Sequence, residues 1–411
     1  MTSAPATPEP LTLNPFEPGF FDNPYEQYRL LREDDPVRPA LVAGWMLFRY
    51  DDIVRLLRDP ALSVEDENVT ETSPRNELVA ELMGDREPRG RRAILNLDPP
   101  DHDRIRRLVS YAFTPKRIQA MRPQVEQLVT EALDAVAGQG AMDVIADLAF
   151  PLPFQVISEM LGMPAGADRD RLRAWSSALV RTLEPIIGPD DIAGAVAASD
   201  AMNDYVRDVL EWKRKEPGDD LLSAMIEAEE GGDRLTDEEL RDQVVLLYIA
   251  GHETTVNLIG NGTLALLRNP GQLLRLRGEP ALDQNAIEEL LRYDSPVQFS
   301  RRITLQPVEI GGHEIEAGSL VLTCLGAANH DPEHWGATAD DLDLGRDGAA
   351  LHVSFGSGIH HCLGAALARV EGQCAIPALV RRFPDLDLAT DAPEWNGRIV
   401  LRGLQRLPVS F

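Results

Sequence analysis

The chain has 411 residues, of which 44% are hydrophobic and 26% charged, proportions that exclude a disordered or low-complexity protein. Its 67 acidic residues outnumber 40 basic ones, and a net charge of −27 argues against binding to nucleic acid or an anionic membrane. No basic residue precedes Arg29, so no secretory signal is visible, and three cysteines provide no disulfide framework. We therefore expect a cytoplasmic protein.

Residues 1–19 carry prolines at positions 5, 8, 10, 15 and 18. Such a density of proline is incompatible with a helix and predicts an extended N-terminal arm. From residue 20 to residue 411 no stretch has the composition of a linker, and no internal repeat occurs. We expect this part to form a single domain.

The elements expected beyond the arm are mostly helices. A strand is expected over 45–50, and an apolar stripe predicts a helix over 124–137. Thr236 and Glu239 form a capping-box pattern that opens a long helix reaching about Leu267. Further helices are expected over 285–293 and from near Cys362 to about Phe383, with short strands over 308–310 and 319–323. The fold class is mainly α with a minor antiparallel β sheet. Pro377 should bend or end the last helix.

The most specific stretch is FGSGIHHCLG, residues 355–364. Two glycines and a cysteine before the helical run AALARVEG predict a tight loop that places Cys362 at a helix N-terminus. Unpaired N–H groups and the helix dipole favour a thiolate there, and a thiolate can bind a metal. Gly356 and Gly358 would let the backbone pass close to a flat ligand, and Phe355 could shield the sulfur from water.

Two simpler interpretations of Cys362 are a buried structural cysteine and a zinc site. Zinc would use His360, His361 and Cys362, but structural zinc needs four ligands in spaced pairs and no CxxC partner exists.

Taken together, the ten residues resemble the haem-binding signature of the cytochrome P450 family, F-G-x-G-x-H-x-C-x-G. Every fixed position matches: Phe355, Gly356, Gly358, His360, Cys362 and Gly364. The resemblance implies an α-rich triangular prism that encloses haem b, formed by residues 20–411. It also implies that Cys362 is the axial thiolate ligand of the iron.

The long helix carries AGHETT at 250–255. Thr254 or Thr255 can bond the carbonyl four residues back and open the helix locally, so a polar patch or kink is one interpretation. The motif is similar to the acid–alcohol pair of the family. That similarity implies a proton relay through Glu253 and Thr254 to dioxygen, with Ala250 and Gly251 leaving room above the haem.

EELLR at 288–292 places Glu289 and Arg292 on one helix face, where such pairs are commonly solvated salt bridges. The pair also resembles the structural E-x-x-R of the family on the proximal side of the haem. The family often adds a downstream arginine before a phenylalanine, but alignment places Asp341 and Leu342 at those positions.

A helix expected after Pro99-Pro100 brings His102 and Arg106 onto one face, where the basic residues could simply be solvated. The stretch resembles the H-x-x-x-R of the family, which would direct both residues at a haem propionate. Arg302 and His360 match further propionate contacts, and the spacing does not separate Arg302 from Arg301.

No GxGxxG follows a strand, so no nicotinamide or flavin module is expected. The resemblance implies a class I bacterial-type monooxygenase that receives electrons from an external ferredoxin and ferredoxin reductase. Residues 86–117 hold nine basic and four acidic side chains, which could form a docking surface; a solvated helix is the alternative. Reversing the charge at Arg104 or Arg107 should then slow reduction.

The resemblance places a small hydrophobic organic substrate above the haem, between 63–95, 172–190, 246–251, 297–300 and 396–400. The pocket residues it assigns are Val297, Gln298, Phe299 and Ile399. The reaction would hydroxylate or epoxidise a bulky molecule such as a macrolide or terpenoid. Two alternatives are a peroxide-driven enzyme and a haem-binding sensor or carrier, neither of which requires the acid–alcohol pair. A monomer is the family default.

Overall fold

The computed structural model describes residues 11–40, 43–70, 74–83, 89–110, 113–164, 168–228 and 233–411. The first ten residues of the expected arm and parts of the 63–95 loop lie outside these ranges. Within the described part, residues 11–19 form no helix or strand. Leu13 nevertheless packs with Phe20 and Tyr28 in an apolar cluster, so this end of the arm lies against the body of the protein.

Helices dominate the chain, as predicted. They are α1 (Tyr25–Asp34), α2 (Tyr50–Leu57), α3 (Pro74–Met83), α4 (Asp101–Ser110), α5 (Pro115–Val136), α6 (Pro151–Met160), α7 (Arg169–Val180), α8 (Pro189–Lys215), α9 (Leu221–Glu227), α10 (Asp237–Arg268), α11 (Pro270–Gly278), α12 (Asp283–Tyr293), α13 (Leu325–Ala328), α14 (Pro332–Trp335) and α15 (Ala365–Arg382). In the described residues no helix is both long and apolar enough to cross a bilayer.

Strands form small sheets at the margins of the helices. They are β1 (Val37–Pro39), β2 (Trp45–Leu47), β3 (Leu62–Ser63), β4 (Ala141–Asp143), β5 (Phe299–Thr304), β6 (Val308–Ile310), β7 (His313–Ile315), β8 (Leu320–Cys324), β9 (Asp387–Leu388), β10 (Glu394–Trp395), β11 (Leu404–Arg406) and β12 (Pro408–Ser410). The largest sheet has the order β1-β2-β8-β5-β3. Its neighbouring strands are antiparallel, except that β2 and β8 are parallel. The chain that connects these two parallel strands is far longer than a hairpin loop.

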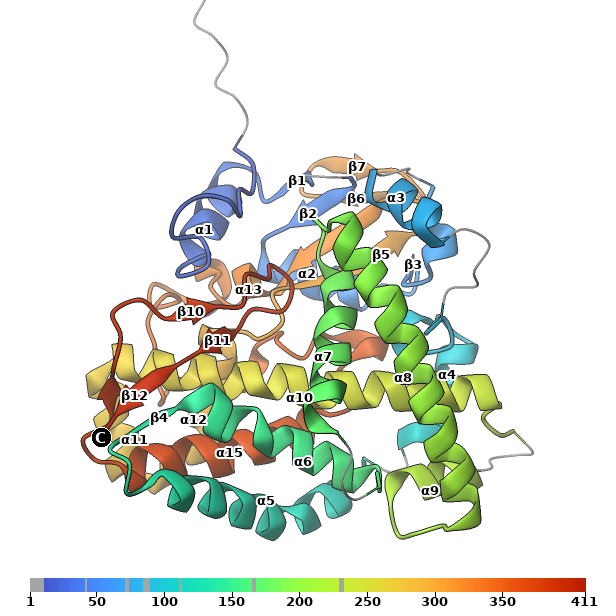
Figure 1. Cartoon of the computed structure of the whole chain (residues 1–411). Coiled ribbons are helices and arrows are strands. Elements are labelled where there is room, and N and C mark those ends of the chain that lie inside the picture. The colour runs from blue at the N-terminus through green and yellow to red at the C-terminus, as the bar shows by residue number, and fades with distance from the viewer. Residues whose placement is uncertain are drawn as a thin grey trace, which may run out of the picture.

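The helix α10 crosses the middle of the molecule, with α15 and α5 on one side and the five-stranded sheet on the other (Figure 1). Its start carries the predicted capping box, since Thr236 accepts from the Glu239 N–H and Glu239 accepts from the Thr236 N–H. Beyond its first turns most of its side chains are buried, as expected of a helix packed on several sides.

The helix α15 continues through Pro377, so this proline does not end it; the predicted bend stays a prediction. Pro377 is buried, and α15 packs along α5, α10 and α12, so tertiary contacts outweigh the lost backbone hydrogen bond. Gly372 contributes to this packing. An added Cβ there would lie 3.1 Å from Ile287 Cγ2 and 3.2 Å from Leu258 Cδ2.

Candidate active site

The loop before α15 places the Cys362 thiol at the start of that helix. The Cys362 N–H donates to the Phe355 carbonyl at 2.9 Å, which closes the loop. Gly358 has a φ of +72°, and a Cβ there would collide with the Leu57 carbonyl oxygen, so only glycine fits this position. The motif glycines therefore let the loop turn tightly against α2.

The Cys362 side chain is accessible, yet protein surrounds it closely enough to raise the pKa of its thiol through burial. The N–H groups of Gly364 and Ala365 act in the opposite direction and favour the thiolate. A group that is both accessible and desolvated borders an internal space rather than the outer surface. The thiol is therefore placed to bind something held within the protein.

Basic side chains, which form what is called the cationic cluster below, gather beside this loop. The rings of His102 and His360 lie 4.5 Å apart, and Arg106 Nη2 donates to the His361 carbonyl at 2.8 Å. Burial, and after it the neighbouring Arg302, His102 and Arg106, lower the pKa of His360 to about 3. These four residues, predicted from separate motifs, are thus brought together.

Among the described residues, one carboxylate pairs with the cluster: Asp103 lies 2.9 Å from His102 Nδ1. His102 Nε2 is buried without a hydrogen-bond partner. Arg302 is 6% exposed and donates to Ser300 Oγ and the Arg301 carbonyl, with no carboxylate in ion-pair distance among the described residues. Burial lowers the pKa of Arg302 to about 10. Arg301 instead pairs with Asp66 at the surface. The two carboxylates of a haem fit these unsatisfied donors.

The cluster does not form a zinc site. Among the described residues, no three His, Cys, Asp or Glu side chains come together as ligands. A metal bound by Cys362 would therefore need its remaining ligands from a cofactor, which fits a haem and does not fit structural zinc.

On α10, Ala250 is exposed and Thr254 is half-exposed although their helix is central, so both border internal space. Thr254 Oγ1 donates to the Ala250 carbonyl at 2.9 Å, as predicted for a hydroxyl that bonds four residues back. Gly251 faces α6 instead, where an added Cβ would lie 2.9 Å from Ile157 Cδ1. Its predicted role in leaving room for oxygen stays a prediction.

Glu253 forms an ion pair with Arg398, a contact that the sequence did not indicate. Arg398 lies in the turn between β10 and β11, 145 residues downstream. Only the nearness of 396–400 to the expected substrate pocket hinted at this segment.

The predicted pocket segments 297–300 and 396–400 lie side by side: Gln298 N donates to the Val400 carbonyl at 2.9 Å, and Val297 bridges to Leu401. Phe299 and Ile399 pack in the apolar cluster of Tyr28. The Gln298 side chain is buried and donates to Tyr25 and Ser295. Val297 is half-buried. Their contact with a substrate stays a prediction.

Glu289 and Arg292 are both fully buried, and the guanidinium donates to the carboxylate at 2.8 and 2.9 Å. The third partner is Arg346, whose Nε lies 3.1 Å from both Glu289 oxygens. The alignment had placed Asp341 and Leu342 there. The structure uses an arginine five residues beyond Asp341, so the network is complete.

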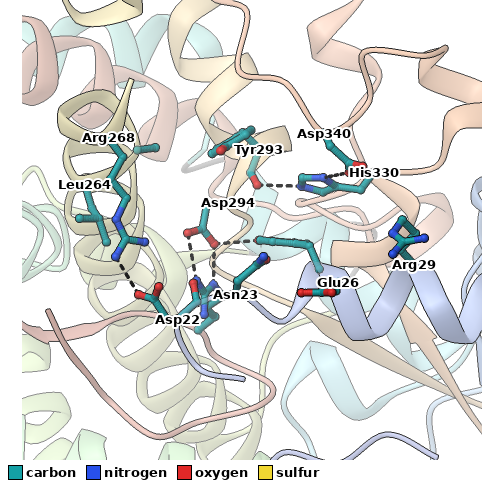
Figure 2. Close-up of a pocket in the computed structure, with 13 residues that line it drawn as sticks. Asp22, Asn23, Glu26, Arg29, Leu264, Arg268, Tyr293, Asp294, His330 and Asp340 are labelled. Atoms are coloured by element: carbon teal, nitrogen blue, oxygen red, sulfur yellow. Dashed lines mark hydrogen bonds and ion pairs between the residues drawn. The ribbon is translucent and has the colours of Figure 1, made fainter. Parts of the chain in front are cut away.

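A polar pocket of about 470 Å³ lies elsewhere, between α1 and the C-terminal end of α10 (Figure 2). Several of its polar groups pair with one another: Arg268 with Asp22 at 2.8 Å, and the His330 ring with Asp340 at 2.9 Å. None of the predicted site residues lines it, so it is not the candidate active site.

The cytochrome P450 profile matches residues 68–394. The chain belongs to the cytochrome P450 family. It is 42% identical over 400 residues to cytochrome P450 107B1 of Saccharopolyspora erythraea, covering 96% of each protein. It is 42% identical over 403 residues to the vitamin D(3) 25-hydroxylase of Pseudonocardia autotrophica, again covering 96% of each. The myxobacterial cytochrome P450 CYP267B1, solved with myristic acid, matches with a TM-score of 0.88 at 36% identity, over 96% of this chain and 98% of that one.

These likenesses confirm the predicted P450 fold and identify the chain as an oxidoreductase of the cytochrome P450 family. Membership implies a haem cofactor, a small-molecule substrate and redox partners. Cys362 and the cationic cluster are the residues that fit the haem.

Proposed function

We propose that this cytochrome P450 is a monooxygenase that hydroxylates or epoxidises a bulky, largely hydrophobic molecule, such as a macrolide, a terpenoid or another secondary metabolite. It uses dioxygen and electrons from an external ferredoxin and ferredoxin reductase. The observation that carries the proposal is the accessible, desolvated Cys362 thiol beside two buried donors, the unpartnered His102 Nε2 and the Arg302 guanidinium, which has no carboxylate partner among the described residues. Haem b, with Cys362 as its thiolate ligand, supplies the chemistry of oxygen activation when bound.

The chain's own residues would hold this cofactor through Cys362 and through the basic residues beside it. The N–H groups of Gly364 and Ala365 stabilise the Cys362 thiolate. Phe355, whose ring stacks under the Arg369 guanidinium at 4.6 Å, shields the loop from water and keeps the sulfur environment dry. His102, Arg106, Arg302 and His360 would donate to the haem propionates.

Glu253 and Thr254 would move protons toward the dioxygen that is reduced. Cleaving the bond of dioxygen requires protons delivered to one oxygen in a site without bulk water. A hydroxyl that borders internal space beside a half-buried carboxylate suits this task. A haem carrier or sensor has no use for such an acid–alcohol pair. The presence of Glu253 and Thr254 therefore favours a monooxygenase.

The relatives support the proposed substrate class. One is named a vitamin D(3) 25-hydroxylase, and another was solved with myristic acid. Both molecules are largely hydrocarbon, which agrees with an apolar substrate here.

The deciding experiment is the visible spectrum of the purified protein, reduced with dithionite and exposed to carbon monoxide. The parent protein should show the strongly red-shifted Soret band of thiolate-bound haem, Cys362→Ser should lose it, and the matched control Cys374→Ser should keep it. A band typical of histidine ligation in the parent protein, or its retention in Cys362→Ser, would contradict the proposal.

A further inference from the structure

Arg398 joins three segments that surround the proposed proton path. Its Nη1 forms the ion pair with Glu253 on α10, and its Nη2 donates to Ser177 Oγ on α7 at 2.8 Å. Arg398 is 9% exposed and the Glu253 side chain is 17% exposed. An ion pair so shielded from water is stronger than one at the surface, so Arg398 determines where the Glu253 carboxylate lies.

A second contact fastens the same turn to the end of α7. Glu184 follows the short helix Arg181–Leu183 and is 7% exposed. Its carboxylate accepts the N–H groups of Ile399 at 2.7 Å and Val400 at 3.1 Å. Any displacement of this end of α7 must therefore break contacts to the turn that carries Arg398.

The other side of the turn is fixed. Asn396 accepts the Arg398 N–H at 3.0 Å and donates to the Leu401 carbonyl at 2.9 Å, and Gln298 binds Val400 through the backbone. The turn is thus a rigid support that links α7 to Glu253.

The other charged or titratable groups near Glu253 cannot replace Arg398. His252 Nε2 lies 3.8 Å from the carboxylate, but burial lowers the pKa of His252, so it is neutral near pH 7. Arg173 of α7 stacks over the Phe150 ring at 4.0 Å, and Glu184 carries the same sign of charge as Glu253. Among the described residues, Arg398 is the only arginine or lysine that forms an ion pair with Glu253.

Resting on the proposed function, we propose that Arg398 is a positioning residue for proton delivery, which makes the placement of Glu253 depend on the packing of α7 against the 396–403 turn. Arg398 keeps its own proton. The proton comes from water, passes to the Glu253 carboxylate and is handed to the Thr254 hydroxyl, which gives up its own proton to dioxygen, so that both residues return to their starting forms. A substrate that alters the position of α7 thereby alters the proton supply.

The test compares Arg398→Gln, Arg398→Lys and Ser177→Ala with Arg406→Gln, a control at an exposed arginine of β11 that binds Asp143. The first readout, independent of turnover, is amide hydrogen exchange over residues 174–188 in the ferric, substrate-free protein. The second is the fraction of consumed NADPH recovered as product between pH 6 and 8.5, in light and heavy water, with a ferredoxin and reductase as donors.

Arg398→Gln should speed exchange over 174–188 and lower the product fraction roughly tenfold, with a changed pH profile and solvent isotope effect. Arg398→Lys should restore the pH profile to within about threefold of the parent, because a cation again faces Glu253. Ser177→Ala should speed exchange and shift the isotope effect in the same direction as Arg398→Gln but by less, because Glu184 still holds the turn, and Arg406→Gln should change neither readout.

Parent-like exchange and a parent-like pH profile in Arg398→Gln would overturn the inference, as would failure of Arg398→Lys to restore the profile. A parent protein without the red-shifted carbon monoxide band overturns the proposed function instead. In that case unchanged exchange in Arg398→Gln still overturns the link between Arg398 and α7.

Discussion

Arg346 donates from its Nε to both carboxylate oxygens of Glu289, each at 3.1 Å, so that one buried carboxylate serves two arginines. Arg292 binds the same carboxylate, and both guanidinium groups also donate to the Asp341 carbonyl. The backbone of 338–341 is thereby held against α12. This network supports the segment between the sheet and the Cys362 loop.

Glu289→Gln should therefore be strongly destabilising. The change leaves two buried guanidinium groups without a counter-charge, which costs about 3–5 kcal/mol. In urea denaturation the variant should unfold at a much lower midpoint concentration of urea, or it should not accumulate in a folded form at all. The matched control is Glu279→Gln, an exposed carboxylate 3.7 Å from Arg275, which should change the midpoint little. Equal midpoints for the two variants would contradict the assignment.

Local signals in the sequence were sufficient for the elements that depend on neighbours in the chain. The capping box of Thr236 and Glu239 correctly predicts the start of α10, and the glycine spacing correctly predicts a tight loop before α15. The strand expected over 45–50 is shorter, because Tyr50 begins α2. The helix expected over 124–137 begins earlier, at Pro115, where Thr114 accepts the Arg117 N–H.

Contacts between distant segments could not be predicted in the same way. Arg398 binds Glu253 across 145 residues, and Arg346 binds Glu289 across 57. An isolated arginine has no periodicity and no spacing motif that identifies its partner. The same limit applies to the parallel pair of β2 and β8, which only the folded chain brings together.

Arg302 and Arg301 should differ in their effect on haem retention. Arg302 is buried with no carboxylate partner, whereas Arg301 pairs with Asp66 at the surface. Arg302→Gln should release haem to apomyoglobin several-fold faster than the parent protein, because a charge-assisted bond to a propionate is lost. Arg301→Gln should stay close to the parent rate. Faster release from Arg301→Gln than from Arg302→Gln would reverse the assignment.

Thr254→Ala should uncouple electron use from product formation. Removing the hydroxyl should lower the product formed per NADPH roughly tenfold or more and raise peroxide release, because proton delivery fails. Thr263→Val is the matched control, since Thr263 lies on the same helix, is fully buried and is about two and a half turns away. Coupling that stays intact in Thr254→Ala would remove this residue from the proton path.

A test of the docking surface predicted over residues 86–117 requires variants other than the charge reversals at Arg104 or Arg107 that the sequence suggested. Arg104 pairs with the buried Glu239, Arg92 with Asp101 and Arg89 with Asp200, so their charges are partly neutralised within the chain. A charge reversal at Arg104 would also disturb the start of α10.

If an acidic ferredoxin is the electron donor, as proposed, Lys116 and Arg117 are better placed to receive it. Both are exposed at the start of α5, which packs against α15, and neither forms an ion pair in the described part of the chain. Changing both to Glu should slow reduction by a ferredoxin several-fold at low salt, less at high salt, without altering substrate affinity. Arg207→Glu on α8 is the control. Equal reduction rates in all three proteins would exclude this surface.

Glu288 should make stability depend on acidic pH. Burial alone would raise the pKa of Glu288, but hydrogen bonds from His352 at 3.2 Å and Arg369 at 2.7 and 2.9 Å outweigh it and lower the pKa to about 2. Since this value lies below the ordinary 4.5, the stabilisation is complete above pH 4.5 and is lost as the pH falls toward 2.

Glu288→Gln should accordingly lower the free energy of unfolding by about 2–3 kcal/mol at pH 7. The difference from the parent protein should stay constant down to about pH 5 and narrow below pH 4.5, where the parent's carboxylate also becomes protonated on unfolding. Urea titrations of both proteins between pH 7.5 and pH 4 measure this difference in the free energy of unfolding. A difference that keeps its full size at pH 4 would mean that His352 and Arg369 stabilise Glu288 by packing rather than by charge.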